Sequence, residues 1–363
     1  MDAEAVLSSL DGLCGELRPG DLFPPHQELM KRLDASERAV RWALDELRRQ
    51  GKIVRRQGAG TFVAELKPEP AQSEVSNGAG SLLPSTMSDA GTIVAIATPD
   101  HGYYDLAMKL LFHQAEAAGF GVAYRLVDAA ASRLPALPKL KDGPLGFIVF
   151  RFDLAPLAQQ LQQAGHRVVL MGAPLVDQEL GVPNVYGDHE VGGYLATKHL
   201  IDLGHRRIGY IGDVKTQRTL RWQGHLRAIR ESRRCGHDVS DAFIPLKEML
   251  AWKTDLARGR EYLSQSDAPT GLVGWNDQEA LVLLGLLSRM GLRVPEDISV
   301  VGYDNLPESE WGHPSLTTVN GGVDQQLRGA LNVLTRAAPV SPHYNLVVVP
   351  TLIARESSGS HAG

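Results

Sequence analysis

Several side chains that can hydrogen-bond a small polar molecule stand directly after short apolar runs of the sequence. They are Asp100, Arg151, Asp153, Asn276, Asp277, Tyr303 and Asp304, and Arg221 lies shortly after another such run. Guanidinium, amide and carboxylate groups bind neighbouring hydroxyls, and aromatic rings stack on apolar ring faces. The aromatic residues interspersed with them are Tyr103, Trp222, Trp252, Trp275 and Trp311. These residue types fit a site for a polyhydroxylated ring, but each single residue also fits a surface ion pair or a loop cap.

The elements that would position these residues alternate along the second part of the chain. Short, β-branched apolar runs lie at 92–97, 121–126, 146–150, 167–171, 207–212, 271–275 and 298–303. Helical segments lie between several of them, at 104–118, 154–164, 189–203, 218–235 and 277–290. This alternation predicts parallel sheets with helices on both faces. The length of the region predicts two such sheets, hence two lobes with a cleft, and ligands bind beyond the carboxyl ends of such strands.

A second group of chemically active residues lies near the N-terminus. Residues 31–56 hold nine Lys or Arg against four Asp or Glu, whereas the whole chain carries a net charge of −5. A basic patch of this kind attracts phosphate groups, but a solvated helix face can have the same composition. Charge alone therefore leaves both interpretations open.

Hydrophobic spacing favours the first interpretation. The pattern predicts helices over 3–16 and 26–33, a turn at 18–21 and a third helix that has Ser36 as its N-cap. The inner stripe of the third helix consists of Val40, Ala43, Leu44 and Leu47. Basic residues then lie on the outer face of this helix, where they can reach DNA.

A hairpin is expected after the third helix. The sequence predicts strands over 53–57 and 61–63, and the glycines between them allow a tight tip that can approach DNA phosphates. Three helices followed by a basic hairpin form a winged helix-turn-helix, whose third helix enters the major groove. The residues expected to contact DNA are Ser36, Arg38, Arg41, Trp42, Arg55, Arg56, Gln57 and Gly58.

Composition narrows the class of protein. The chain has 363 residues, of which 43% are hydrophobic and 22% charged, as expected for two or three ordinary globular domains. The N-terminus lacks the features of a secretory signal and no apolar run reaches membrane-spanning length, so we expect a cytoplasmic protein without membrane contact. Cys14 and Cys235 lie in no metal or disulfide spacing, and we expect no metal and no cofactor.

These patterns divide the chain into four segments. Residues 67–91 are rich in Pro, Ser and Gly and lack periodicity, which is typical of a flexible linker. We expect a DNA-binding domain at 1–66, this linker, a two-lobed ligand-binding and dimerisation body at 92–356 and a tail at 357–363. The fold class is therefore α/β, with a winged helix-turn-helix head and a parallel sheet in each lobe of the body.

The head resembles the DNA-binding domain of GntR-type regulators. The segments PGDLFP, QELM, VRWALDEL and GKIVRRQGAGTFV follow one another in the order of that family. Members commonly carry Arg where this chain has Gln27 and Glu37, so the resemblance transfers DNA contacts only at Arg41 and around Gln57 and Gly58. Glu37 keeps two interpretations, a contact to the cytosine N4 group or a favourable interaction with the helix N-terminus.

The body resembles the effector domain of LacI/GalR-type regulators, which is related to periplasmic sugar-binding proteins. The resemblance rests on 188–211, RWQG at 221–224, WNDQEA at 275–280, VPEDISVVGYD at 294–304 and PSLTTV at 314–319. It implies effector contacts at Arg221, Asn276 and Asp304, with the Arg221 guanidinium holding two ligand hydroxyls. All three side chains are expected to face the cleft rather than the core. Further candidate effector contacts are Trp275, Asp100, Arg151 and Tyr103; the last three lie in a first lobe, 92–184, that matches the family more loosely.

The two resemblances together imply a ligand-responsive bacterial transcription regulator of the arabinose-repressor type, with repression favoured over activation. The expected partners are double-stranded DNA with a palindromic operator, a second copy of the chain and a small effector. A sugar is favoured as the effector, and a purine or another small molecule is the alternative. The motifs of common nucleotide-binding, metalloprotease and hydrolase sites are absent, which disfavours an enzyme. A free transport receptor conflicts with the DNA-binding head.

Overall fold

The computed structural model describes most of the body and parts of the head. The described residues are 3–16, 21–24, 26–36, 39–40, 43–44, 47, 52–56, 60–63, 91–98, 102–127, 143–176, 178–213 and 219–361. Of the expected linker, only Gly91 is among them. Within this described part, no helix is both long and apolar enough to cross a bilayer.

The head contains the predicted helices and hairpin. Its elements are α1 (Ala3–Glu16), β1 (Leu22–Phe23), α2 (His26–Leu33), β2 (Ile53–Arg56) and β3 (Gly60–Val63), and residues 39, 40, 43, 44 and 47 are helical. Val40, Ala43 and Leu47 are fully buried, which confirms the predicted inner stripe. The sequence pattern misses β1, which pairs antiparallel with β3 and extends the hairpin to three strands.

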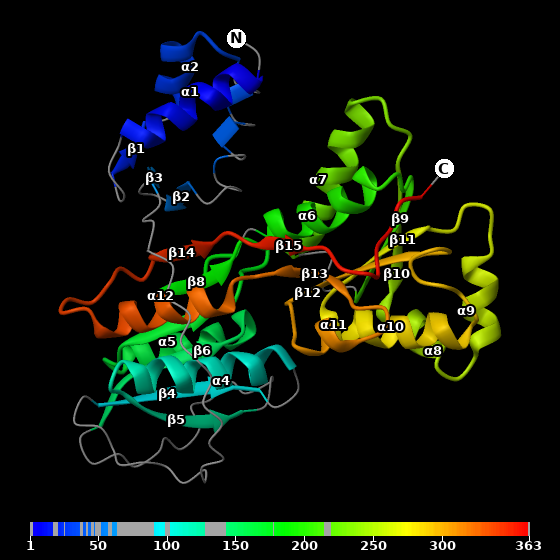
Figure 1. Ribbon diagram of the computed structural model, residues 1–363. Coiled ribbons are helices and arrows are strands. Elements are labelled where there is room, and N and C mark those ends of the chain that lie inside the picture. Colours follow the sequence, from blue (N-terminus) through cyan, green and yellow to red (C-terminus); the bar gives the residue numbers. More distant parts are fainter. Residues whose placement is uncertain are drawn as a thin grey trace, which may run out of the picture.

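The first lobe is a six-stranded parallel sheet with helices on both faces (Figure 1). Its elements are β4 (Thr92–Ala97), α4 (Gly102–Ala117), β5 (Gly121–Leu126), β6 (Pro144–Phe150), η1 (Phe152–Leu154), α5 (Ala155–Gln163), β7 (Val168–Met171), β8 (Asn184–Gly187), α12 (Val323–Thr335) and β14 (Asn345–Val348). The strand order is β14-β8-β7-β6-β4-β5, and all pairs are parallel. Helices α4 and α12 pack on one face and α5 on the other.

The second lobe repeats this architecture (Figure 1). Its elements are α6 (His189–Asp202), β9 (Arg207–Gly212), α7 (Leu220–Arg234), β10 (Ser240–Pro245), α8 (Leu246–Ala251), α9 (Leu256–Leu263), β11 (Gly271–Gly274), α10 (Asp277–Arg289), β12 (Ser299–Tyr303), α11 (Glu308–Trp311), β13 (Thr317–Asn320) and β15 (Thr351–Ile353). The order is β10-β9-β11-β12-β13-β15, and only the β13–β15 pair is antiparallel. Helices α6 and α7 cover one face, and α8, α9 and α10 cover the other.

The chain passes between the lobes three times. The connections follow β8, β13 and β14 and lead into α6, α12 and β15. Two parallel sheets confirm the predicted two-lobed α/β body. The lobe boundary differs from the prediction, which gave 92–184 alone to the first lobe, because α12 and β14 return to it and bury their apolar residues there.

The expected tail at 357–363 is part of the second lobe as far as the structure describes it. The backbone N of Val300 donates to the Ser357 carbonyl (2.8 Å), and the N of His361 donates to the Leu203 carbonyl (2.8 Å). The His361 ring also stacks on His205, with ring centroids 5.0 Å apart. These contacts correct the predicted end of the body at 356, because residues 357–361 satisfy backbone groups of the second lobe.

Candidate functional site

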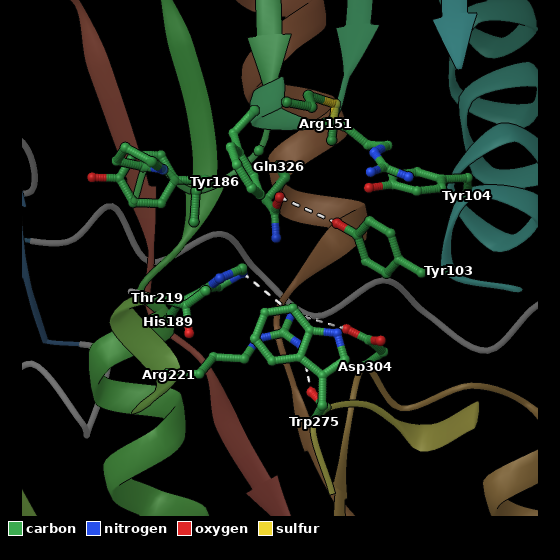
Figure 2. Close-up of a pocket in the computed structure, with 15 residues that line it drawn as sticks. Tyr103, Tyr104, Arg151, Tyr186, His189, Thr219, Arg221, Trp275, Asp304 and Gln326 are labelled. Carbon is green, nitrogen blue, oxygen red and sulfur yellow. Dashed lines mark hydrogen bonds and ion pairs between the residues drawn. The ribbon is translucent and has the colours of Figure 1, made fainter. Parts of the chain in front are cut away.

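A cavity lies between the two lobes of the body (Figure 2). Its volume is about 680 Å³ with its open side included, which is space for a small molecule. The lining residues are Tyr103, Tyr104, Arg151, Phe152, Met171, Gly172, Ala173, Pro174, Tyr186, His189, Thr219, Arg221, Trp275, Asp304 and Gln326. Both lobes contribute to this wall, so a bound molecule would contact both of them.

Strand ends position most of these side chains. Arg151 follows β6, Trp275 follows β11 and Asp304 follows β12, each at the carboxyl end of its strand. This is the edge at which open parallel sheets bind ligands. Arg221 arrives differently, as the second residue of α7, whose N-cap Thr219 accepts a hydrogen bond from a backbone N–H of the first turn.

The Arg221 guanidinium is held by the protein itself. Its Nη1 donates to the Trp275 carbonyl (2.7 Å), and its Nη2 donates to Asp304 Oδ1 (3.3 Å) and His189 Nε2 (3.4 Å). Its Cζ lies 3.6 Å from the centroid of the Tyr303 ring, a cation–π contact. The Nε atom is buried and has no partner among the described residues. Because both hydrogens of Nη2 are engaged, the outer fork cannot hold two ligand hydroxyls, which corrects the expectation from the sequence.

Close packing of two helices fixes the backbone at Arg221. A Cβ on Gly193 of α6 would lie 2.0 Å from the Arg221 carbonyl oxygen, and one on Gly224 of α7 would lie 1.9 Å from the Glu190 carbonyl oxygen. Real Cβ atoms do not approach backbone this closely, so both positions require glycine. Gly193 and the glycine of RWQG therefore have a structural reason: they let α6 and α7 pack with Arg221 in the cavity wall.

Asp304 is the buried acid of the cavity. Its side chain is 3% exposed, so desolvation raises its pKa to about 7 even though the Arg221 guanidinium favours the ionised form. The neighbouring carboxyl groups of Asp277 and Glu279 contribute to this rise of the pKa. Its backbone φ is 116°, a value that non-glycine residues rarely adopt. The pair of Arg221 and Asp304 is therefore tightly built into the second lobe and is not simply presented to the cleft.

Asp277 holds the loop that carries Asp304. Its carboxylate accepts hydrogen bonds from the Leu306 backbone N (2.8 Å), from Ser309 Oγ (2.7 Å) and from Thr318 Oγ1. These bonds join the start of α10 to the loop after β12. Its place after an apolar run makes Asp277 a candidate ligand contact in the sequence, but its carboxylate is fully buried in this network and positions the loop instead.

The first lobe supplies a second pair, formed by Arg151 and Asp153. Arg151 Nε donates to Asp153 Oδ1 (2.9 Å), and its Nη2 forms an ion pair with Asp153 Oδ2. Its Nη1 donates to Thr98 Oγ1 (3.3 Å). The two charged side chains are 27% and 31% exposed. Arg151 has a backbone φ of 84°, which turns the chain sharply between β6 and η1.

Neutral polar groups complete the wall. Desolvation, together with the nearby Arg221 charge, lowers the pKa of His189 well below its usual value, so this imidazole is neutral. Since Nε2 of His189 accepts from Arg221, its proton resides on Nδ1. Tyr103 Oη donates to Gln326 Oε1 (3.4 Å), and Gln326 Nε2 donates to the Gly321 carbonyl (2.7 Å). Within the described residues, no three His, Cys, Asp or Glu side chains cluster as metal ligands.

The structure brings five of the seven candidate effector residues together. Arg221, Asp304, Trp275, Arg151 and Tyr103 line the cavity. Asn276 is absent from this lining: it is 1% exposed, and its Oδ1 accepts from the Glu279 backbone N (2.9 Å), which caps α10. Asp100 lies outside the described residues.

Three aromatic residues nominated from the sequence lie elsewhere. Trp222 and Trp252 are buried in the two cores of the second lobe, and Trp311 is 80% exposed on α11. The rings that line the cavity include Tyr104, Phe152 and Tyr186, which sequence reasoning missed, as it missed His189, Thr219, Gln326 and residues 171–174. The strand-end rule finds Tyr186 and His189 once β8 is recognised, but this strand has only four residues. Gln326 has no such signal, because it lies on α12.

The candidate DNA contacts are described only in small part. Arg38, Arg41, Trp42, Gln57 and Gly58 lie outside the described residues, and Arg55 and Arg56 are described only as backbone of β2. Ser36 Oγ accepts a hydrogen bond from the Ala39 backbone N (3.3 Å), which is the predicted N-cap geometry. An ion pair between Lys52 and Asp11 joins the start of the hairpin to α1.

Comparisons with known proteins place both parts of the chain. Residues 13–63 match bacterial regulatory proteins of the gntR family, and residues 197–358 match the periplasmic binding protein-like domain. An arabinose metabolism transcriptional repressor of Geobacillus stearothermophilus is 27% identical over 95% of this chain and 94% of its own length. The HTH-type transcriptional repressor PurR of Haemophilus influenzae is 34% identical over 51% of this chain and 57% of its own.

A solved structure shares the fold of the body. A LacI family transcriptional regulator from Enterococcus faecium, with bound ribose, has a TM-score of 0.59 at 20% identity and covers 74% of this chain and 99% of that one. The curated relatives reported above are transcriptional repressors and not enzymes. The chain is therefore a transcriptional repressor that joins a GntR-type DNA-binding domain to a periplasmic-binding-protein-like body.

Proposed function

We propose that the body binds a sugar in the interlobe cavity and that this binding controls the attachment of the head to an operator. The observation that carries the proposal is the cavity itself, which joins both lobes and combines a buried carboxylate with several aromatic rings. Carboxylates accept from hydroxyls and aromatic rings cover apolar sugar faces. Two similar proteins support a sugar, since one is an arabinose metabolism repressor and the other is a regulator with bound ribose. Acting on DNA, the protein would work in the cytoplasm.

The residues proposed to contact the sugar are those that line the cavity. Asp304 would accept a hydroxyl hydrogen at Oδ2, since its Oδ1 is engaged by Arg221. Trp275, Tyr103 and Arg151 would surround the ring. The sequence also nominates Asn276 and Asp100, and both remain predictions. The Asn276 amide caps a helix, and Asp100 lies outside the described residues.

A thermal-shift screen tests the effector. The full chain is mixed with arabinose, ribose, lactose and, for the alternative effector class, purine bases. A ligand of the folded state at a hundred times its Kd adds about 2.7 kcal/mol of stability, which raises Tm by several degrees. A shift with sugars supports the proposal, whereas a shift with purine bases alone favours the alternative, which the similarity to PurR recommends. A sugar that is consumed rather than retained would contradict the role as an effector.

A second part of the proposal concerns DNA. We propose that Arg41, Arg56 and the neighbouring residues nominated from the sequence bind a duplex whose affinity falls steeply with salt, because neutralised phosphates release counterions. The test is a mobility-shift titration with a duplex selected from a random pool. Arg41→Ala and Arg56→Ala should weaken binding, and addition of the effector should change it. Equal affinity for both variants and the wild type would contradict this assignment.

We further propose a homodimer that reads an inverted repeat, because symmetric dimers bind symmetric half-sites. The body exposes three apolar residues on α4 and the edge strand β5, namely Phe112, Tyr124 and Leu126, at 42%, 59% and 50%. Exposed apolar groups that lie together mark protein contacts. Sedimentation velocity of the wild type and of Tyr124→Lys would show whether a dimer forms and whether this face belongs to it.

A further inference from the structure

We propose that the effector is a glycoside, a sugar ring that carries an aromatic group at its anomeric carbon, and that the first lobe binds this aromatic group. The inference deepens the proposed effector function and rests on it. It follows from the unequal chemistry of the two halves of the cavity wall (Figure 2). The half that the second lobe contributes is mainly polar, whereas most of the half from the first lobe is apolar.

The second lobe offers the groups that bind hydroxyls. It contributes His189, Thr219, Arg221, Trp275 and Asp304. Arg221 engages Asp304 at Oδ1 and the neutral His189 at Nε2, so a ligand can meet the carboxylate at Oδ2 and the imidazole at its Nδ1–H. A carboxylate oxygen accepts from one hydroxyl, and an imidazole N–H donates to another. The Trp275 ring, whose centroid lies 4.9 Å from Arg221 Cζ, adds an apolar face, so this half suits one sugar ring.

The first lobe contributes an apolar wall that is larger than one face of a sugar ring can cover. The apolar and aromatic side chains of this half are Tyr103, Tyr104, Phe152, Met171, Ala173, Pro174 and Tyr186. The rings of Tyr103 and Tyr104 pack edge to face, with centroids 5.4 Å apart, and so form a continuous aromatic surface. Such a surface favours stacked or edge-to-face contact with a further aromatic ring.

The polar side chains of this half have partners within the protein. Gln326 accepts from Tyr103 Oη (3.4 Å) at Oε1 and donates to the Gly321 carbonyl (2.7 Å) from Nε2. Arg151 forms an ion pair with Asp153. A second sugar unit in this half would exchange the water on its hydroxyls for a mainly apolar wall, which is unfavourable. An aromatic group would lose little hydration and gain apolar contact.

The apolar wall is held in place by the cores of the first lobe. Met171 and Ala173 are 3% and 7% exposed, and the ring of Phe152 packs against the core that lies under α5. The cavity volume of about 680 Å³, open side included, lies within the range of about 300–1,000 Å³ of pockets that bury drug-sized molecules. Such molecules are larger than one sugar ring, so a sugar and an aromatic group fit together.

Phe152 provides the variant that tests the first-lobe half. Phe152→Ala removes one ring from this wall and none of the polar groups of the second lobe. Phe120→Ala is the matched control. Phe120 is a partly buried phenylalanine of the same lobe, but it packs against the other core and is not among the cavity-lining residues. The two variants therefore lose the same ring inside and outside the proposed site.

The experiment is calorimetry on the full chain with ligand series that share one sugar. The series are arabinose, methyl arabinoside and phenyl arabinoside; glucose, methyl glucoside and phenyl glucoside; and ribose, methyl riboside and adenosine, with both anomers of the synthetic glycosides and with adenine as a further probe. For the sugar that binds, the aromatic member should bind about ten- to a hundredfold more tightly than the methyl member. The reason is that burying an aromatic ring removes on the order of 100 Å² of apolar surface from water.

In Phe152→Ala this ratio of affinities should fall by about three- to tenfold, because part of the aromatic contact is lost, while the affinity for the methyl glycoside changes by less. Phe120→Ala should keep the ratio of the wild type. If Phe152→Ala is not folded by its thermal midpoint, Phe152→Leu serves as a second variant: it keeps an apolar side chain against the core, removes the ring and should lower the ratio in the same direction.

The outcomes separate this inference from the proposed function. Phenyl glycosides that bind tightly without adenosine identify an aryl glycoside, the converse identifies a nucleoside, and both support the shared chemistry. Free or methylated sugars that bind the wild type as tightly as every aromatic member would overturn the inference while the sugar-effector function stands. An unchanged ratio in folded Phe152 variants would overturn the role of the first lobe. Adenine that binds as tightly as adenosine would show that the sugar is dispensable, and if no sugar binds in any form, both proposals fail.

Discussion

The arginine–aspartate pairs of the two lobes, Arg221 with Asp304 and Arg151 with Asp153, differ in burial and in origin. Arg221 and Asp304 come from different elements, α7 and the loop after β12, and are 9% and 3% exposed. Arg151 and Asp153 are neighbours in one turn and are about a third exposed. The first pair depends on the whole second lobe for its geometry, whereas the second is made locally and can be changed without moving an element.

This difference has an energetic consequence. A buried ion pair carries a large desolvation penalty that only its own geometry offsets, so the loss of one partner leaves an uncompensated charge. A partly exposed pair is solvated in either state and contributes little to stability. We therefore expect the buried pair to link ligand binding to folding, and the local pair to contribute little to folding.

The largest expected effect is that of Arg221→Ala on stability. It leaves the Asp304 carboxyl buried without its cation and should lower the free energy of unfolding by about 3–5 kcal/mol. Arg151→Ala should lower it by less than about 1 kcal/mol. Urea unfolding of the full chain, followed in the transition of the body, measures both.

Comparable losses of unfolding free energy in Arg221→Ala and Arg151→Ala would contradict the distinction between the buried and the local pair. A double-mutant cycle with Asp304→Asn then decides whether the loss at Arg221 belongs to the pair. In that cycle, Arg221→Ala should lower the free energy of unfolding by less in the Asp304→Asn background, because a neutral amide no longer needs the cation.

A smaller effect is expected from the helix contact that seats the buried pair. Gly224→Ala would place a Cβ 1.9 Å from the Glu190 carbonyl oxygen, so α7 must move away from α6. We expect a loss of about 1–3 kcal/mol, typical of overpacking, together with weaker effector binding because Arg221 moves with the helix. Gly285→Ala is the control, since a Cβ there meets nothing within 4 Å in α10 and alanine favours a helix. Equal stability of the Gly224 variant and the wild type would show that α6 and α7 separate easily.

The sequence predicts the local elements of both regions better than their assembly. Apolar runs such as 92–97 and 207–212 became strands with nearly the same bounds, because burial on both faces demands continuous apolar residues. Strands β8 and β13 are as short as β7, but they hold only one or two apolar residues each and therefore give no such signal. The return of α12 to the first lobe depends on contacts between residues more than a hundred positions apart, which no local pattern contains.

The same limit applies to the site. The strand-end rule and the family resemblance find Arg221, Asp304, Trp275, Arg151 and Tyr103, since each stands at a position that the fold points towards the cleft. They cannot tell that the Asn276 amide caps α10 or that the Asp277 carboxylate anchors a loop, because a helix cap and a loop anchor require the same residue types as a ligand contact. Nor do they show that Asp153 neutralises Arg151.

Asn276 offers a test of this ambiguity with an effect of intermediate size. If its amide acts as a cap, Asn276→Ala should lower the free energy of unfolding by about 1 kcal/mol and leave effector affinity within a fewfold of the wild type. Asn276→Ser, which can still cap α10, should restore the stability. Calorimetry with the identified sugar and urea unfolding give the two values. A large loss of affinity in both variants would instead support the contact that the family resemblance implies.

The smallest effect is expected from pH, and only the buried pair should show it. Asp304 has a pKa of about 7, because desolvation outweighs Arg221, and Asp277 and Glu279 of α10 add negative charge nearby. The folded-state pKa lies above the ordinary value, so the folded state holds this proton up to about pH 7 and the group's contribution to stability declines as the pH rises to that point.

A sugar hydroxyl that donates to Asp304 Oδ2 favours the ionised form, so binding should lower this pKa and release a proton near neutrality. Effector affinity should therefore rise by up to about tenfold between pH 6 and pH 8, because the ionised fraction of Asp304 rises by about that factor when its pKa is about 7. His189 does not add to this change, because its lowered pKa keeps it neutral throughout the range. Calorimetry in buffers of different ionisation enthalpy detects the released proton, and Asp304→Asn should abolish both the release and the pH dependence. Arg151→Gln should retain both, since the Arg151–Asp153 pair does not supply the proton of Asp304. A pH dependence that survives in Asp304→Asn would assign the proton to another group.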